Sequence, residues 1–267
     1  VDEFLVVWER HMSAIDVDIL AQRVSPTGSQ LGSPISVAFQ GVNTAASVGI
    51  MDGGNEAWVV AWEHRALPFN TRNIRAAAIL SDGTLMNRIT VGGVSNVEER
   101  APDVASGETS GYIAWKEDGF GIRCGVVGLD ELDQLELHDT LTVSSDPSAR
   151  GPAMDAANRA HSEVLVAWIY DFNPATEAVA VARWSTAGGI PVARDVHYST
   201  QPLDHVDCSS RDDGDYFIVW DEGQPSGRNI LGCRALFHGE SQIPVVQGPF
   251  PIEWNPAADN HSPAIAY

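Results

Sequence analysis

The sequence contains almost no lysine. Lys116 is the only one, and every other basic residue apart from the histidines is an arginine. Against 36 acidic residues, this leaves a formal net charge of −20 at pH 7. A surface of that sign repels phosphate backbones and anionic lipids. We therefore expect neither a nucleic acid nor a membrane as a partner.

Cysteine is scarce as well, and its number is odd. Cys124, Cys208 and Cys233 form no CxxC pair and have no histidine at metal-ligand spacing, which excludes a complete disulfide framework and argues against a metal site. We expect these three residues to be small buried side chains. The sequence also lacks an apolar run long enough to span a membrane, a P-loop, a GxSxG motif and any convincing helical period.

What the chain does contain is a repeat. Five aromatic and aliphatic runs end in a tryptophan, and these tryptophans are 54, 53, 53 and 52 residues apart. Such regularity over the whole chain indicates one structural unit in five copies. The tryptophans are Trp8, Trp62, Trp115, Trp168 and Trp220.

Other landmarks divide each copy into four short strands. A strand with small residues follows each tryptophan run, and a glycine turn such as Asp82-Gly83 then leads to a third strand. A fourth strand, typified by Ala101 to Ala105, precedes the aromatic run. In the run Tyr216 to Trp220 both alternating faces are apolar, which is typical of a strand covered on both sides. We predict an all-β fold, a five-bladed β-propeller of four-stranded antiparallel blades.

The two ends of the chain complement each other. It begins on an aromatic strand, the second of a unit, and Ser262 to Ala266 resembles the first strand of a unit. We expect the C-terminal strand to pair with the N-terminal strands and so close the ring. We predict one domain, 1–267, whose blades cover about 261–267 plus 1–40, then 44–93, 100–145, 151–200 and 204–250.

Loops of variable length and high charge follow the tryptophan strands and precede the first strands, and we expect both sets on one rim. Variable loops on a rigid scaffold are where binding usually occurs. Carboxylates and arginines there are suited to sugar hydroxyls or a cation. The alternative is that they cap strand ends and pair with one another across blades, since residues repeated in every copy are explained by repetition of the fold. The candidate ligand residues on this rim are Glu9, Arg10, Glu63, Arg65, Arg100, Arg150, Asp221 and Glu222.

The segment from Gln247 to His261 breaks the repeat and carries Trp254, which matches no repeat landmark. Stacking on a ligand and packing over the closure seam are the two alternatives for this side chain.

Asp103 and Asp207 occupy similar positions on first strands, which line the central channel of a propeller. Paired carboxylates are the machinery of glycoside hydrolases, so these two aspartates are the catalytic candidates of an enzymatic alternative. Asp16-Val17-Asp18 and the run from Asp212 to Asp215 resemble calcium ligands, but turn chemistry explains both. We expect no cofactor.

The best copy of the unit runs from Phe4 to Gly28 and contains Trp8-Glu9, Asp18-Ile19 and Arg23-Val24. It resembles a repeat common in secreted and surface proteins of bacteria such as myxobacteria. This resemblance covers nearly the whole chain and implies an extracellular propeller without implying an activity. Copy three has a shortened loop and lacks the turn glycine, and copy four has Ile169 after Trp168, where copies one, two and five have an acid. In size and blade count the chain is also similar to lectins of the tachylectin type.

Our leading hypothesis is a non-catalytic, lectin-like module that binds carbohydrate on the variable-loop rim, outside the cytoplasm or on the cell surface. The alternatives are a furanosidase-type glycoside hydrolase and a protein-interaction scaffold. We expect the partner to be a carbohydrate or a protein surface, and the chain to be a monomer.

Overall fold

The computed structural model describes ten segments of the chain: 3–51, 56–65, 71–93, 96–158, 163–185, 191–211, 214–224, 227–238, 243–253 and 263–265. All regular structure in these segments is β-strand, so none of them contains a helix long and apolar enough to cross a membrane.

Nineteen strands follow one another along the described segments. We call each group of strands that repeats the unit a blade. Blade 1 contains β1 (Phe4–Ser13), β2 (Asp16–Val24) and β3 (Gln30–Ala38). Blade 2 contains β4 (Val42–Met51), β5 (Ala57–Arg65), β6 (Asn73–Leu80) and β7 (Leu85–Thr90). Blade 3 contains β8 (Glu99–Ala105), β9 (Ser110–Glu117), β10 (Gly121–Leu129) and β11 (Leu135–Ser144). Blade 4 contains β12 (Arg150–Asn158), β13 (Glu163–Asn173), β14 (Thr176–Ser185) and β15 (Arg194–Ser199). Blade 5 contains β16 (Leu203–Ser210), β17 (Asp215–Gln224), β18 (Gly227–Leu236) and β19 (Val245–Glu253).

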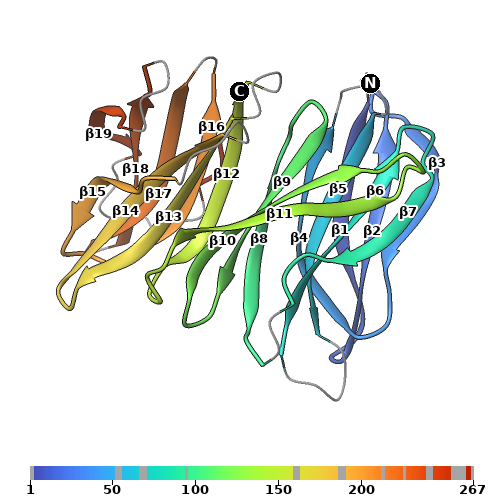
Figure 1. Cartoon of the computed structure of the whole chain (residues 1–267). Coiled ribbons are helices and arrows are strands. Elements are labelled where there is room, and N and C mark those ends of the chain that lie inside the picture. The colour runs from blue at the N-terminus through green and yellow to red at the C-terminus, as the bar shows by residue number, and fades with distance from the viewer. Residues whose placement is uncertain are drawn as a thin grey trace. The chain divides into compact units, whose positions relative to one another are not determined.

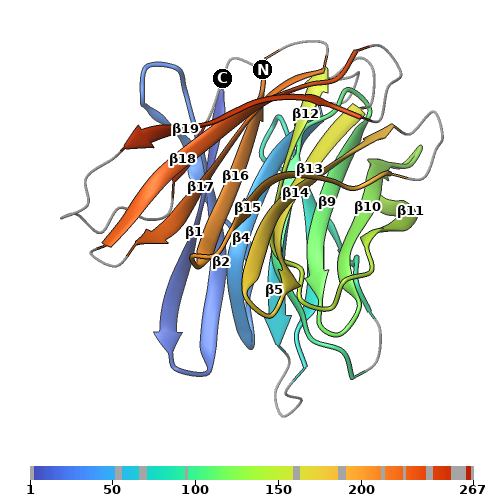
Figure 2. The same cartoon turned by 90° about the vertical axis from the view of Figure 1, so that its left-hand side faces the viewer.

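Blades 2 to 5 are meanders in which each strand pairs with the next (Figures 1 and 2). A single parallel bridge between Val17 and Val42 joins β2 to β4. The chain thus has the all-β, five-bladed propeller fold of four-stranded antiparallel blades that the sequence predicts. Blade 1 has three strands among the described residues, and 263–265 belong to no strand there. The closing pairing between the chain ends therefore stays a prediction.

The chain divides into two compact units, and the predicted single domain likewise stays a prediction. Unit 1 comprises 1–118 and 124–141, and unit 2 comprises 119–123 and 142–267. Within unit 1 strand β4 contacts β8, and within unit 2 strand β12 contacts β16. The first strands of neighbouring blades therefore lie next to each other in both units.

Four of the tryptophan strands, β5, β9, β13 and β17, are covered on both faces, as their apolar pattern predicts. On β1 one face is exposed among the described residues, and it carries Phe4, Val6 and Trp8. On β5, Trp58, Val60 and Trp62 pack against blade 1, whereas Val59 and Ala61 pack against blade 3. Alternating side chains point to opposite faces of a strand, so one apolar run serves two interfaces. Replacing a fully buried tryptophan such as Trp62 by alanine would cost about 3–5 kcal/mol.

Candidate functional site

Each of the four first strands that the structure describes carries a β-bulge near the predicted binding rim. The residue at the bulge has a positive φ in four blades: Ala45 at 52°, Ala101 at 50°, Gly151 at 56° and His205 at 40°. The strand register shifts at the same place in each case. A bulge leaves one residue outside the ladder, so its backbone N–H needs another acceptor.

In unit 1 the carboxylate after the tryptophan supplies that acceptor. The N–H of Ala45 donates to Glu9 Oε1 at 2.8 Å, and the N–H of Ala101 donates to Glu63 Oε1 at 2.9 Å. Each carboxylate thereby ties the bulge of the next blade to its own blade. Two of the predicted ligand residues thus have a structural task that accounts for their recurrence.

The predicted arginines of unit 1 lie on the same rim, and two of them form ion pairs. Arg10 pairs with Asp18 at 2.5 Å. Arg100 lies 3.6 Å from Glu98 and 3.5 Å from Asp118. Arg65 ends β5, where it pairs in register with Val42 of β4. Trp254 lies outside the described residues.

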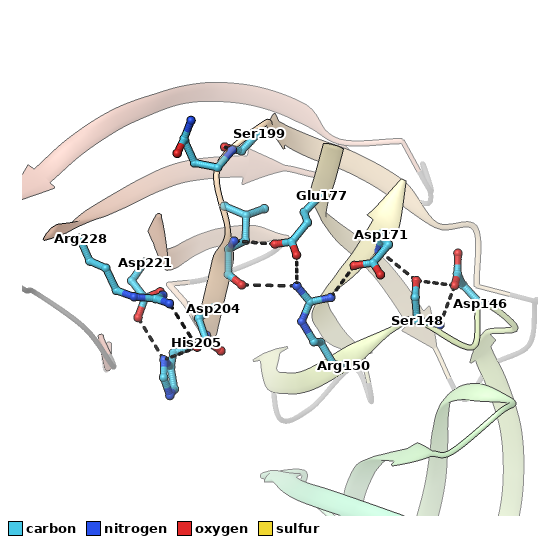
Figure 3. Close-up of polar contacts among 12 residues, drawn as sticks. Asp146, Ser148, Arg150, Asp171, Glu177, Ser199, Asp204, His205, Asp221 and Arg228 are labelled. Atoms are coloured by element: carbon cyan, nitrogen blue, oxygen red, sulfur yellow. Dashed lines mark hydrogen bonds and ion pairs between the residues drawn. The ribbon is translucent and has the colours of Figure 1, made fainter. Parts of the chain in front are cut away.

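In unit 2 the rim carries a continuous polar strip, which Figure 3 shows. Arg150 is its centre. The guanidinium lies 2.9 Å from Asp171 Oδ1 and 2.7 Å from Glu177 Oε1, and it donates to the carbonyl of Leu203 at 3.4 Å. The second oxygen of Glu177 accepts the N–H of Leu203 at 2.5 Å. Blade 4 has Ile169 after its tryptophan, and Glu177 links β16 to this blade through Leu203. The N–H of the bulge residue His205 donates to Asp204 Oδ1 instead.

The strip continues along β16 into blade 5 (Figure 3). Asp221 is fully buried and accepts from Arg228 and from His205 Nδ1, the latter at 3.0 Å. Asp204 lies 3.7 Å from Arg228. Asp204, His205 and Asp221 have ligand atoms within 4.8 Å of one another, a spacing suited to a cation. Arg228 already pairs with both carboxylates, so its own charge occupies that place.

Glu222 points between blades 4 and 5. It lies 2.8 Å from His197 Nε2, and both side chains are largely buried. The imidazole of His197 stacks on Trp220 at 5.0 Å. Glu222 therefore belongs to the packing between the blades.

Blade 5 also differs from blade 2 in how its tryptophan is hydrogen-bonded. In blade 2, Trp62 Nε1 donates to Asn43 Oδ1 at 3.1 Å. Leu203 stands at the position of Asn43 in blade 5, as the strand registers show. Among the described residues, Trp220 Nε1 and both amide atoms of the buried Asn229 have no hydrogen-bond partner. The polar character of this position thus varies between the blades.

The polar strip borders a groove of about 270 Å³. The groove lies beside the loop after the tryptophan strand of blade 4 and the loop before the first strand of blade 5, the two kinds of loop that the sequence places on the binding rim. The Asp171 side chain is 54% exposed. The lining residues are Asp171, Asn173, Pro174, Ala175, Thr176, Glu177, Ser199, Thr200, Gln201 and Pro202.

A larger hollow of about 460 Å³ lies at the other end of blade 5. Three of its polar side chains, Ser210, Asp215 and Arg234, are engaged within the protein. Arg234 binds both oxygens of Asp215, at 2.7 and 2.5 Å, and Ser210 Oγ bonds to Asp155 and to the carbonyl of Ala156. The smaller groove has five uncharged hydrogen-bonding side chains in its lining against two in the larger hollow, so it offers the better set of groups for a polar ligand.

The predicted catalytic aspartates bond to neighbouring backbone or side-chain groups in separate units. Asp103 accepts from Ser47 Oγ at 2.8 Å in unit 1. In unit 2, Asp207 accepts the N–H groups of Ile265 at 2.8 Å and Cys208 at 2.9 Å. Burial raises the pKa of Asp207, these N–H groups lower it, and the charge of Asp155 raises it further. Because the two aspartates lie in different units, their use as a catalytic pair stays a prediction.

In each of the two runs that resemble calcium ligands, one aspartate forms an ion pair with an arginine. Asp18 pairs with Arg10 and Asp215 pairs with Arg234, while 212 and 213 lie outside the described residues.

No protein-family model matches the sequence, and no curated protein matches it. Solved structures do resemble the chain. A mutant of AofleA from Arthrobotrys oligospora has a TM-score of 0.51 at 10% identity, covering all of this chain and 78% of its own. A GH43 β-1,3-galactosidase has a TM-score of 0.51 at 10% identity, covering 95% of this chain and 58% of its own. Trypanosoma rangeli sialidase in complex with sialic acid has a TM-score of 0.53 at 10% identity, covering 92% of this chain.

The chain spans only 42% of that sialidase and 58% of the galactosidase. At such low identities the likeness supports the propeller fold alone. The resemblance of the repeat to that of secreted bacterial proteins stays a prediction.

Proposed function

We propose that the protein is a non-catalytic carbohydrate-binding module and that the groove beside the loops 173–176 and 199–202 is its binding site. The observation that carries this proposal is the lining of the groove. Hydroxyl groups of Thr176, Ser199 and Thr200, the amides of Asn173 and Gln201 and the carboxylate of Asp171 gather in one concave site. Sugar hydroxyls both donate and accept hydrogen bonds, so they need such a mixed set of partners.

The surroundings of the groove suit recognition without large rearrangement. Asp171 and Glu177 are joined through Arg150, and Glu177 is bonded to the backbone of β16. Asn173 Oδ1 accepts the N–H of Ala175 at 2.9 Å, and Ser199 Oγ accepts the N–H of Gln201 at 2.9 Å. Preorganised polar groups lose less conformational entropy when a ligand binds. Two of the similar structures have names that refer to sugars, a galactosidase and a sialidase bound to sialic acid, which is consistent with the proposal.

An extracellular or cell-surface location is part of the proposal. The net charge of −20 with a single lysine is compatible with it. Expression in a bacterial host that carries the full gene, followed by detection in the medium or on intact cells, tests the location.

A glycan array probed with the labelled protein tests the function. We expect binding to a restricted group of glycans that is the same with calcium and with a chelator, because Arg228 already neutralises the carboxylates that are grouped for a cation. Absence of binding under both conditions would contradict the proposal.

A further inference from the structure

The groove has carboxylates in its lining but no basic side chain. Asp171 and Glu177 line it, whereas no arginine, lysine or histidine among the described residues does. The wider polar strip also carries a net negative charge. Five carboxylates stand against two arginines, which gives a formal charge of −3 when His205 is neutral: the acids are Asp146, Asp171, Glu177, Asp204 and Asp221.

The two carboxylates in the groove are not equivalent. Both oxygens of Glu177 are engaged, one by Arg150 and the other by the N–H of Leu203. Asp171 Oδ1 accepts a hydrogen bond from Arg150, and the Asp171 side chain is more than half exposed. Its Oδ2 accepts no hydrogen bond from the described residues, so Asp171 has a negative oxygen available at the groove (Figure 3).

An available carboxylate oxygen favours a positively charged donor. A hydrogen bond between an ammonium group and a carboxylate is stronger than one between neutral groups. A carboxylate on the ligand would instead meet Asp171 and Glu177 without a cation in the lining to compensate, because Arg150 is already bound to both. The charge of the groove thus discriminates between classes of sugar.

We propose that the groove selects sugars with a free amino group, that the ammonium group binds Asp171 Oδ2, and that acidic sugars are rejected. This inference rests on the proposed carbohydrate-binding function and names its ligand class. The hydroxyl and amide groups of Thr176, Ser199, Thr200 and Gln201 would bind the sugar hydroxyls, which all classes of sugar share. Asp171 would then supply the preference among them.

The test is calorimetric titration at pH 6 with three oligosaccharides of equal length that carry free amines, N-acetylated amines or carboxylates. We expect the free amine to bind roughly ten-fold more tightly than the N-acetylated form, which corresponds to one charge-assisted hydrogen bond. The acidic oligosaccharide should bind more weakly than both. Raising the salt concentration should reduce the preference, since the aspartate is exposed.

Two variants locate the effect. Asp171→Asn keeps an acceptor for Arg150 but removes the charge, and it should abolish the preference for the free amine while the N-acetylated sugar still binds. Glu136→Gln removes the same charge from an exposed position of β11 in the other unit and should leave the preference unchanged.

The outcomes separate this inference from the proposed function. Equal affinity for the free amine and the N-acetylated form, or an unchanged preference in Asp171→Asn, would overturn the inference and leave carbohydrate binding standing. Binding of the acidic sugar as tight as that of the free amine would overturn it as well. Failure of all three oligosaccharides and of the glycan array would instead contradict the proposed function itself.

Discussion

Removing the Glu63 carboxylate should destabilise the protein without affecting sugar binding. Glu63 Oε1 accepts the N–H of Ala101 at 2.9 Å, and Oε2 lies 3.3 Å from Arg72. The carboxylate is 12% exposed. A hydrogen bond to a charged group is worth about 1.5–3 kcal/mol, and an ion pair as exposed as that with Arg72 adds less than about 1 kcal/mol. We therefore expect Glu63→Ala to lose about 2–3 kcal/mol.

Urea denaturation measures this loss as a lower midpoint at an unchanged slope. Glu63→Gln keeps the acceptor oxygen and loses only the charge, so it should lose about half as much. Glu9→Ala removes the equivalent tie, but its carboxylate is 32% exposed, and about 1 kcal/mol is expected. The control is Glu136→Ala on the exposed surface of β11.

The structural role of Glu63 would be refuted if Glu63→Ala were as stable as Glu136→Ala. It would also be refuted if Glu63→Ala kept its stability but no longer bound sugar, since Glu63 would then contact the ligand as the sequence predicts.

Two further predictions concern the backbone and pH. Ala45→Gly should raise the stability by about 0.5 kcal/mol, because Ala45 is exposed at a φ of 52° that glycine adopts without strain; a loss of 1 kcal/mol or more in urea denaturation would contradict the bulge. Burial, followed by the charge of Arg75, lowers the pKa of His64 to about 4. As the pH falls, His64 is therefore protonated in the unfolded chain before it is protonated in the folded protein. The free energy of unfolding should decrease by roughly 2 kcal/mol as the pH is lowered from about 6.5 to 4. His64→Gln should show a smaller fall between pH 7 and 4.5, and an identical fall would contradict this assignment.

The sequence predicts the fold well because the residues that mark the repeat are large apolar side chains, whose main requirement is burial. Trp62 and Trp220 need burial, and the alternation around them needs two covered faces, so regular spacing translates directly into blades. The predicted pairing between the two ends of the chain is less certain to follow from such a pattern. The pairing of Ser262 to Ala266 with the N-terminal strands depends on residues that are only partly described, and it remains a prediction.

The candidate site was harder to predict, for a physical reason. Glu9 and Glu63 are charged, recurrent and on a loop-bearing rim, which are properties of both a ligand residue and a tie between strands. Their partners are backbone N–H groups at the bulges of Ala45 and Ala101, and a backbone donor leaves no mark in the sequence. The two partners of each bond also lie far apart in the sequence, because the bond joins consecutive blades, so no local pattern indicates the contact.

The groove itself went unpredicted although a signal for it exists. Ile169 is the one uncharged residue that directly follows a repeat tryptophan, which marks copy four as different. In the structure Glu177 links blade 4 to the next blade through the N–H of Leu203, and Asp171 lines the groove. Ser199, Thr200 and Gln201 carry no motif at all, and only the fold brings them to the same site.

The most direct test of the proposed function is the affinity of Ala175→Trp for the glycan that binds best on the array. Ala175 is exposed in the turn between β13 and β14 and lines the groove, so an indole there should fill the groove without disturbing a buried contact. Calorimetric titration should show that binding is lost while the urea midpoint stays that of the unmodified protein. Undiminished affinity in this variant would contradict the assignment of the groove as the carbohydrate-binding site.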